Sequence, residues 1–212
     1  ADVAAALGDD GEDDAYDDVV EEDAVVGRDH EIARLQVLWT SRAPAVSIVS
    51  GPSGVGKSAL LAAARARFLA TYKDGWWLDG RCIEEEAVPW KALDRVVDAL
   101  VAALLALTKD ERKKLVDDDV ADAARLFPAL TRLPDQRRRP TPAKDAGEAK
   151  KAGAAALRRL LARVAAARPL VVVIDDLHWG DVDSVPLIDE LFAAQPGEGR
   201  APALLLIGAV RE

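Results

Sequence analysis

The residues best suited to chemistry lie in one glycine-rich segment, Gly51-Pro52-Ser53-Gly54-Val55-Gly56-Lys57-Ser58, which fits the pattern G-x-x-x-x-G-K-[ST]. Glycines allow a backbone to curl around a phosphate with its N–H groups pointing inward, where a Cβ would obstruct close approach. Lys57 is spaced to reach the β- and γ-phosphates of a nucleotide, and the Ser58 hydroxyl to bind Mg²⁺. The residues expected to contact a nucleotide are Pro52, Ser53, Gly54, Val55, Gly56, Lys57, Ser58 and Ala59.

The segments on either side of this loop support the same interpretation. Residues 45–50 form a short, apolar, β-branched run, which predicts a buried strand. Residues 59–69 are mostly strong helix formers, and the helix they predict points its positive end at the same anion. A glycine-rich turn that merely precedes Lys-Ser is the alternative, but the order strand, loop, helix favours a phosphate-binding loop.

A second group of chemically suited residues follows the run Leu170-Val171-Val172-Val173-Ile174. Five consecutive apolar residues predict a strand that is buried on both faces of a parallel sheet. Binding groups of such sheets lie at the carboxyl ends of the strands, where Asp175 and Asp176 fall. Asp175 is therefore a candidate to hold Mg²⁺, directly or through water, and Asp176 to orient or deprotonate an attacking water. A strand that simply ends in an acidic turn is the weaker alternative beside a phosphate loop.

Arg211 ends the last apolar run of the chain, which covers residues 202–210 and predicts a further buried strand. An arginine at the carboxyl end of such a strand can face the γ-phosphate as a sensor or charge stabiliser. The alternative is that Arg211 only solvates the end of the chain. With Asp176, Arg211 is the second residue for which we expect a catalytic role.

These residues need a scaffold that brings distant parts of the chain to one edge of a sheet. The alternation of apolar runs and helical stripes predicts a three-layer α/β fold, with a mainly parallel sheet and helices on both faces. Predicted strands lie near residues 45–50, 76–82, 170–175 and 203–210, and predicted helices near 29–41, 59–69, 89–105, 149–168 and 183–194, with a weaker helical region over 110–130 and a loop over 134–147.

The composition excludes several classes of protein. A single cysteine, Cys82, rules out an internal disulfide framework and suits a reducing compartment. No apolar run approaches the roughly 20 residues that span a bilayer, and no secretory signal pattern is present, so we expect a cytoplasmic protein without membrane contact. The triplet Arg137–Arg139 lacks interleaved aromatic residues, so nucleic-acid binding by this segment is not expected. The absence of methionine indicates a fragment of a longer protein.

The net charge of −9 comes from the first part of the chain. Residues 1–24 contain 11 acidic residues and no lysine or arginine, whereas the remaining residues contain 26 acidic and 28 basic ones. Such a segment repels itself and is predicted to be a disordered linker, although a specific docking tail is a possible alternative. We therefore divide the chain into an acidic linker, residues 1–24, and one domain, residues 25–212.

With these pieces placed, the chain resembles the ATPase module of the STAND branch of AAA+-related P-loop proteins, found in large bacterial regulators. Its segment Val26-Gly27-Arg28-Asp29-His30-Glu31 is similar to the family's N-terminal motif beside the nucleotide, with His30 where glutamate is commoner. Residues 51–58 are similar to the Walker A loop, and residues 174–181 to the Walker B form "hDDLHWAD". Residues 205–211 resemble the strand that ends in the sensor arginine. Residues 80–93 look like the matching region of modules fused to serine/threonine kinases and helical repeats.

The resemblance implies a P-loop NTPase fold of the ASCE/AAA type, with ATP or ADP and Mg²⁺ as cofactors. It also implies that Val26, Gly27 and Arg28 contact the nucleotide. It further implies fused or associated signalling domains and nucleotide-driven self-association as partners. The family's helical lid would follow residue 212, so residues 25–212 are expected to hydrolyse ATP more slowly than a chain that includes the lid.

Three functions fit these observations. The first is a nucleotide-dependent switch that binds Mg-ATP and hydrolyses it slowly within a larger signalling protein. The second is a kinase that transfers the γ-phosphate to a small acceptor, and the third is a non-hydrolysing scaffold with bound ADP. The Asp175–Asp176 pair suits a water nucleophile and therefore favours the first. Phosphate release separates the switch from the scaffold, and a search for phosphorylated acceptors separates it from the kinase.

Overall fold

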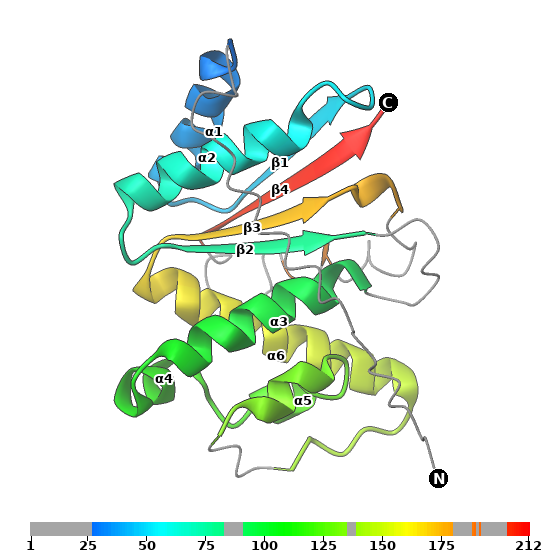
Figure 1. Cartoon of the computed structure of the whole chain (residues 1–212). Coiled ribbons are helices and arrows are strands. Elements are labelled where there is room, and N and C mark those ends of the chain that lie inside the picture. Colours follow the sequence, from blue (N-terminus) through cyan, green and yellow to red (C-terminus); the bar gives the residue numbers. More distant parts are fainter. Residues whose placement is uncertain (1–26, 83–90, 135–138, 180–187, 190, 192–202) are drawn as a thin grey trace, which may run out of the picture.

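The computed structural model describes residues 27–82, 91–134, 139–179, 188–189, 191 and 203–212. These residues form three layers, with α1 and α2 on one face of a sheet and α3, α5 and α6 on the other (Figure 1). The predicted three-layer α/β fold is therefore confirmed. The elements are α1 (Asp29–Ser41), β1 (Ala45–Gly51), α2 (Lys57–Thr71), β2 (Trp76–Arg81), α3 (Lys91–Ala106), α4 (Lys109–Leu115), α5 (Val120–Ala123), η1 (Pro128–Arg132), α6 (Ala146–Ala167), β3 (Leu170–Asp175), η2 (Leu177–Trp179) and β4 (Leu204–Arg211).

The four described strands form one parallel sheet in the order β1-β4-β3-β2. All of them point the same way, so their carboxyl ends meet at one edge (Figure 1). In the register, Gly51 of β1 pairs with Arg211 of β4, and Asp175 of β3 pairs with Arg81 of β2. The predicted strands agree with the observed ones to within about one residue at each end, which is the usual uncertainty of such boundaries.

The centre of the sheet is buried on both faces, as predicted for β3. Along β3, alternate side chains pack into two different hydrophobic cores. Val171 and Val173 contribute to the core under α1 and α2, whereas Leu170, Val172 and Ile174 contribute to the core under α3 and α6. Side chains of a strand point alternately to opposite faces, so a continuous apolar run is what two covered faces require.

The strand predicted at residues 45–50 is confirmed, but the prediction that it is buried was wrong for one of its faces. β1 pairs only with β4 among the described strands, and the side chains of Val46 and Ile48 are 55% and 53% exposed. Ala45 and Val49 of the same strand pack against the core under α1 and α2. The described helices thus cover one face of β1 and leave the other open, because α3 and α6 lie over β2, β3 and β4.

Most predicted helices are confirmed, and local capping explains where two of them begin. α1 occupies the predicted range, and α6 begins where the Asp145 carboxylate accepts a hydrogen bond from the Glu148 N–H. The weak helical region 110–130 is divided into α4, α5 and η1, and α4 begins with a capping box of Thr108 and Glu111. The predicted helix over 183–194 lies almost wholly outside the described residues. None of the described helices combines the length and apolarity needed to cross a bilayer.

An ionic cluster joins α5 to α6 in the helical layer. The Asp119 carboxylate accepts hydrogen bonds from Arg159 Nε at 2.6 Å and from Arg163 Nη2 at 2.9 Å. Arg163 Nε also donates to the Leu115 carbonyl at 2.6 Å, which ties the end of α4 to α6. Burial by itself raises the pKa of Asp119, but the two arginines outweigh burial and lower that pKa below its ordinary value.

Asp119→Asn is expected to lower the free energy of unfolding by about 1–3 kcal/mol at pH 7, because two arginines lose a charged acceptor. A carboxyl whose pKa is depressed in the folded state stabilises that state above its unfolded pKa of about 3.9. This contribution is lost as the pH falls through the folded pKa, so the difference between variant and parent should shrink in acid. Urea unfolding from pH 7 to pH 3 measures this difference in the free energy of unfolding, and Asp118→Asn, at an exposed neighbouring residue, is the control. A difference that stays constant with pH contradicts the assignment.

Candidate functional site

A cavity of about 420 Å³ opens beside the loop between β1 and α2. Figure 1 shows this loop at the carboxyl edge of the sheet. The cavity brings together residues from four separate parts of the chain. Most of the residues predicted to act on phosphates, Mg²⁺ or water line it. The lining residues are Ser53, Gly54, Gly56, Lys57, Ser58, Ala59, Arg81, Asp175, Asp176, His178, Trp179 and Arg211.

The loop takes a conformation that depends on its glycines. Gly54 and Gly56 have φ angles of +77° and +89°, in the left-handed region that other residues rarely adopt. A Cβ at either position would meet no atom within 4 Å, so the requirement is conformational, and the space beside these glycines is open. Among the described residues no side chain caps α2, which leaves the N–H groups of its first turn available to an anion.

Lys57 provides the positive charge of the site. Its Nζ atom donates to the Gly51 carbonyl at 2.9 Å and to the Pro52 carbonyl at 3.1 Å. These bonds hold the ammonium group over the loop, on the side that faces the cavity. A cation beside several uncapped N–H groups is a suitable environment for the phosphates of a nucleotide.

Ser58 and Asp175 meet in the same cavity, although 117 positions separate them in the sequence. The Ser58 hydroxyl donates to Asp175 Oδ2 at 3.1 Å. Hydroxyl and carboxylate oxygens are the ligands that Mg²⁺ prefers, and Mg²⁺ sites usually complete their shell with water and substrate phosphates. In the described part of the chain no group of three or more His, Cys, Asp or Glu side chains could hold a metal by itself. The two residues therefore fit a Mg²⁺ ion that is shared with a phosphate.

Asp176 follows β3 in a strained backbone conformation, with a φ angle of +52°. Its N–H donates to Asp175 Oδ1 at 2.8 Å. Asp176 Oδ2 accepts from Arg81 Nε at 3.0 Å and lies 2.9 Å from Arg81 Nη2. Asp176 thus lies in the cavity as a carboxylate that is separate from the Ser58–Asp175 pair.

Arg81, His178 and Trp179 line the cavity but were not predicted as site residues. Arg81 is the last residue of β2, so its place at the carboxyl end of a predicted strand was a usable signal. His178 accepts a hydrogen bond from the Arg211 N–H at 3.2 Å through Nδ1, and its ring contacts that of Trp179. This bond links the turn after β3 to the end of β4. The side chain of Arg211 lies at the same edge, in the wall of the cavity.

The N-terminal motif contacts the other side of the phosphate loop. Arg28 Nη2 donates to the Val55 carbonyl at 2.8 Å, and Arg28 Nη1 pairs with Glu31 at 2.9 Å. The hydrogen bond from the Arg28 side chain to the Glu31 carboxylate is the main reason that the pKa of Glu31 lies below its ordinary value. Gly27 adopts a φ angle of +86°, whereas Val26 lies outside the described residues. Arg28 and Val55 line a second cavity of about 550 Å³ that reaches Lys57, so Arg28 lies beside the loop, while its predicted contact with a nucleotide stays a prediction.

Comparisons with known proteins give the following. Residues 24–207 match the family model described as an AAA ATPase domain. A solved structure, that of the Walker-type ATPase PABY2304 of Pyrococcus abyssi, is similar to 88% of this chain at 15% sequence identity, with a TM-score of 0.49. The match covers 45% of that protein, so the chain spans less than half of its length. No curated protein matches the sequence significantly.

Proposed function

Because this chain belongs to the AAA ATPase domain family, we propose that it binds ATP with Mg²⁺ and hydrolyses it slowly, as a nucleotide-dependent switch in a larger regulatory protein. The observation that carries the proposal is the single cavity lined by Lys57, the Ser58–Asp175 pair and Asp176. It offers a cation for phosphates, oxygen ligands for a divalent ion and a further carboxylate for water. The proposed partners are ATP and the signalling domains that the switch would control.

In the proposed reaction, the N–H groups at the start of α2 and Lys57 Nζ bind the β- and γ-phosphate oxygens. The Ser58 hydroxyl and the Asp175 carboxylate would hold Mg²⁺, which would supply positive charge to neutralise the phosphates. Asp176 orients the attacking water and accepts its proton while the water oxygen bonds to the γ-phosphorus. The bond from this phosphorus to the bridging oxygen breaks, and ADP and phosphate leave. Arg211 stabilises the charge that develops on the γ-phosphate.

The contact of Arg81 with Asp176 supports the proposed role of Asp176 in binding the attacking water. Arg81 binds Oδ2 of Asp176, and no side chain or backbone group in the described ranges forms a hydrogen bond to Oδ1 of the same carboxylate. The free oxygen can therefore bind water while the arginine holds the carboxylate in place. A carboxylate that is held in place with one oxygen facing water is the arrangement that general-base catalysis requires.

The test is a measurement of bound and hydrolysed nucleotide. The purified chain is first analysed for nucleotide that copurifies with it, and single-turnover hydrolysis is then measured with and without Mg²⁺. Slow, Mg²⁺-dependent release of phosphate supports the switch. Tight ADP binding without phosphate release contradicts the proposed hydrolysis and supports a non-hydrolysing scaffold with bound ADP. Loss of ATP without free phosphate, together with a phosphorylated small molecule, supports the kinase instead.

Asp175→Asn is expected to raise the Mg²⁺ concentration for half-maximal hydrolysis by at least about tenfold, because the variant removes a charged oxygen ligand. The amide keeps the size of the side chain and can still accept the Ser58 hydrogen bond, so the fold should not change. Hydrolysis rates over a Mg²⁺ titration at fixed ATP measure the effect. Asp74→Asn, an exposed acid at the opposite edge of the sheet, is the control. An unchanged Mg²⁺ dependence removes Asp175 from the metal site.

A further inference from the structure

The turn after β3 is seated on the end of β4 by two contacts. Leu177 of η2 packs over Gly208, where a Cβ would come within 2.7 Å of Leu177 Cδ2, so the missing side chain of the glycine makes room for the leucine. His178, the next residue, accepts the hydrogen bond from the Arg211 N–H at 3.2 Å through Nδ1. The two contacts join the turn that begins at Asp176 to the strand that carries Arg211.

Without His178, the Arg211 N–H would lack an acceptor in the described sheet. β3 pairs with β4 only as far as Gly208, whereas β4 continues to Arg211. The next N–H along the chain, that of Glu212, donates to the Gly51 carbonyl of β1 at 3.4 Å. Successive N–H groups of a strand point to opposite sides, so the Arg211 N–H points to the side where β3 has left the sheet. His178 supplies the acceptor that a further residue of β3 would have supplied.

Only a neutral imidazole can make this bond. Nδ1 of His178 accepts, so the proton of the neutral ring lies on Nε2. Protonation of Nδ1 turns the acceptor into a donor, which cannot bond to an N–H group. The ring also contacts that of Trp179, with 5.0 Å between the centroids, and the Trp179 N–H donates to the Asp176 carbonyl at 2.9 Å. His178 therefore lies between Asp176 and Arg211 in a connected set of contacts.

We propose that His178 is a positioning residue for ATP hydrolysis, because its neutral ring holds the end of β4 against η2 and so keeps Arg211 in the same cavity as Asp176. The three residues line this cavity together. The proposed base and the proposed charge stabiliser must both reach the γ-phosphate, and a displacement of about 1 Å can cost about 100-fold in rate. This role rests on the proposed function, whereas the bond between His178 and β4 does not depend on it.

Several charged side chains line the cavity together with His178. They are Arg211 of β4, Asp175 of β3, Asp176 of the turn that follows, Arg81 of β2 and Lys57 of α2. Among these types of side chain, only histidine has an ordinary pKa, about 6.5, that lies between pH 5 and 8. A rate of hydrolysis that changes over this range therefore provides a test of His178, provided that variants separate its contribution from that of the other groups.

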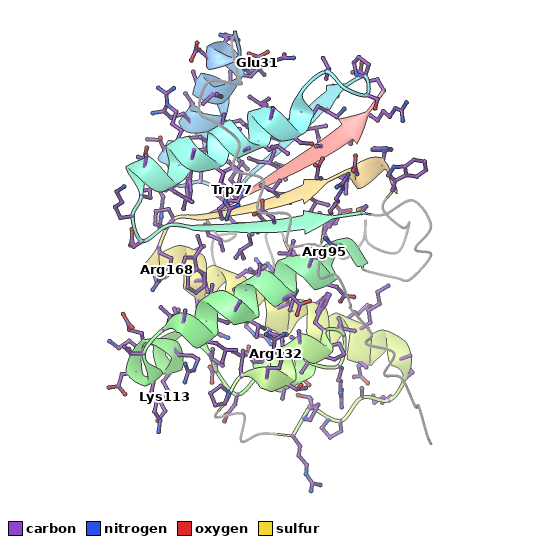
Figure 2. All side chains as sticks on the ribbon, viewed as in Figure 1. Glu31, Trp77, Arg95, Lys113, Arg132 and Arg168 are labelled. Atoms are coloured by element: carbon purple, nitrogen blue, oxygen red, sulfur yellow. The ribbon has the colours of Figure 1, made fainter. Side chains whose placement is uncertain are left out.

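The bond itself is tested first, without nucleotide, by hydrogen exchange of the Arg211 amide followed by NMR. His178→Ala is expected to speed this exchange at least about threefold, because the amide loses its acceptor at a strand end. His178→Asn should keep the exchange rate of the parent at pH 7.5, since the asparagine carbonyl can take the place of Nδ1. Lys113→Ala on α4, which lies far from this edge of the sheet, is the control (Figure 2). Equal exchange in His178→Ala and the parent overturns the proposal.

The positioning role is tested by single-turnover hydrolysis at saturating Mg-ATP between pH 5.5 and 7.5. His178→Ala should lower the rate at pH 7.5 at least about tenfold and leave the Kd for Mg-ATP within about threefold, because Lys57 and the Ser58–Asp175 pair are intact. The rate of the parent should fall at least about fivefold from pH 7.5 to pH 5.5, whereas that of His178→Asn should stay nearly constant. A parent rate that does not change with pH, or an asparagine variant as slow as the alanine variant, overturns the proposal.

Two further variants show whether the pH dependence belongs to this histidine. His30→Ala removes the other histidine of the chain and should keep the fall of the rate with pH. Lys113→His, added to His178→Asn, restores the number of histidines on a remote helix, so the rate should stay nearly constant with pH (Figure 2). Loss of the pH dependence in the first variant, or its return in the second, overturns the proposal.

The link to Arg211 is tested by combining two substitutions. In an Arg211→Ala background, His178→Ala should have a clearly smaller effect on the rate than it has in the parent, since the group that it positions is absent. Effects that simply add overturn the proposal. If the parent does not hydrolyse ATP, the proposed function and the positioning role both fail, while the exchange measurement shows separately whether His178 holds β4.

Discussion

Lys57→Ala is expected to weaken the binding of Mg-ATP by at least about 100-fold. In the structure, Lys57 Nζ is held by the Gly51 and Pro52 carbonyls, over uncapped N–H groups of α2. A hydrogen bond to a charged group contributes about 1.5–3 kcal/mol, and the ammonium, which has three N–H groups, can make two with the β- and γ-phosphates once it releases one of the two carbonyls. Their loss amounts to at least 3 kcal/mol, which is roughly 100-fold or more in Kd.

Calorimetric titration with Mg-ATP measures this effect directly. Lys73→Ala removes an exposed lysine from the turn between α2 and β2 and serves as the matched control. Lys57→Ala also removes the hydrogen bonds to the Gly51 and Pro52 carbonyls, so urea unfolding of both variants is measured to check that the fold is kept. A Lys57→Ala chain that unfolds normally and binds Mg-ATP within tenfold of the parent would show that the phosphates lie elsewhere.

Asp176→Asn is expected to retain nucleotide and to lose about 10²- to 10⁴-fold in the rate of hydrolysis, the range typical of a missing general base. Asparagine tolerates the left-handed backbone of this position better than most residues and has nearly the same size. It cannot take a proton from water, and its amide replaces the charged acceptor of Arg81. The Kd for Mg-ATP should stay within about threefold of the parent, because Asp176 is not part of the Ser58–Asp175 pair.

Single-turnover hydrolysis and equilibrium binding, measured on the same preparations, separate the two roles. The informative comparison is between Asp176→Asn and Lys57→Ala, since the first should change turnover and the second binding. Equal losses of nucleotide in both variants would show that binding and catalysis are not divided between these residues. Unimpaired hydrolysis in Asp176→Asn would remove Asp176 from the reaction and direct attention to other groups of the cavity.

The centre of the fold could be predicted because its requirements are local. Five apolar residues in a row specify a strand that is covered on both faces, and β3 lies between β4 and β2 as this pattern requires. The phosphate loop could be predicted equally well, since strand, glycines, lysine and helix follow each other in the sequence without interruption. The gathering of Lys57, Asp175 and Arg211 at one edge followed from the rule that parallel strands share their carboxyl ends.

Other features depend on neighbours that are remote in the sequence. The exposure of Val46 and Ile48 is decided by which helices cover β1, and no pattern within residues 45–50 records this. The contact of Arg81 with Asp176 arises because β2 and β3 are adjacent, although 95 positions separate the two residues. The division of residues 110–130 depends on local capping by Thr108 and on Pro128, which begins η1. The roles of the site residues remain predictions.

The order of the strands has a consequence for biosynthesis. β1 and β2 are made first but lie at opposite edges of the sheet, and they touch each other only through β3 and β4. A ribosome must therefore release residues 170–211 before β1 and β2 can become part of one sheet. Until then the helices on both faces lack β3 and β4, which contribute to both hydrophobic cores. Contacts between such distant segments form slowly and leave apolar surface open to chaperones and proteases. The cavity beside the loop between β1 and α2, which needs β1 and β3 together, would be completed only at the end of this sequence of events.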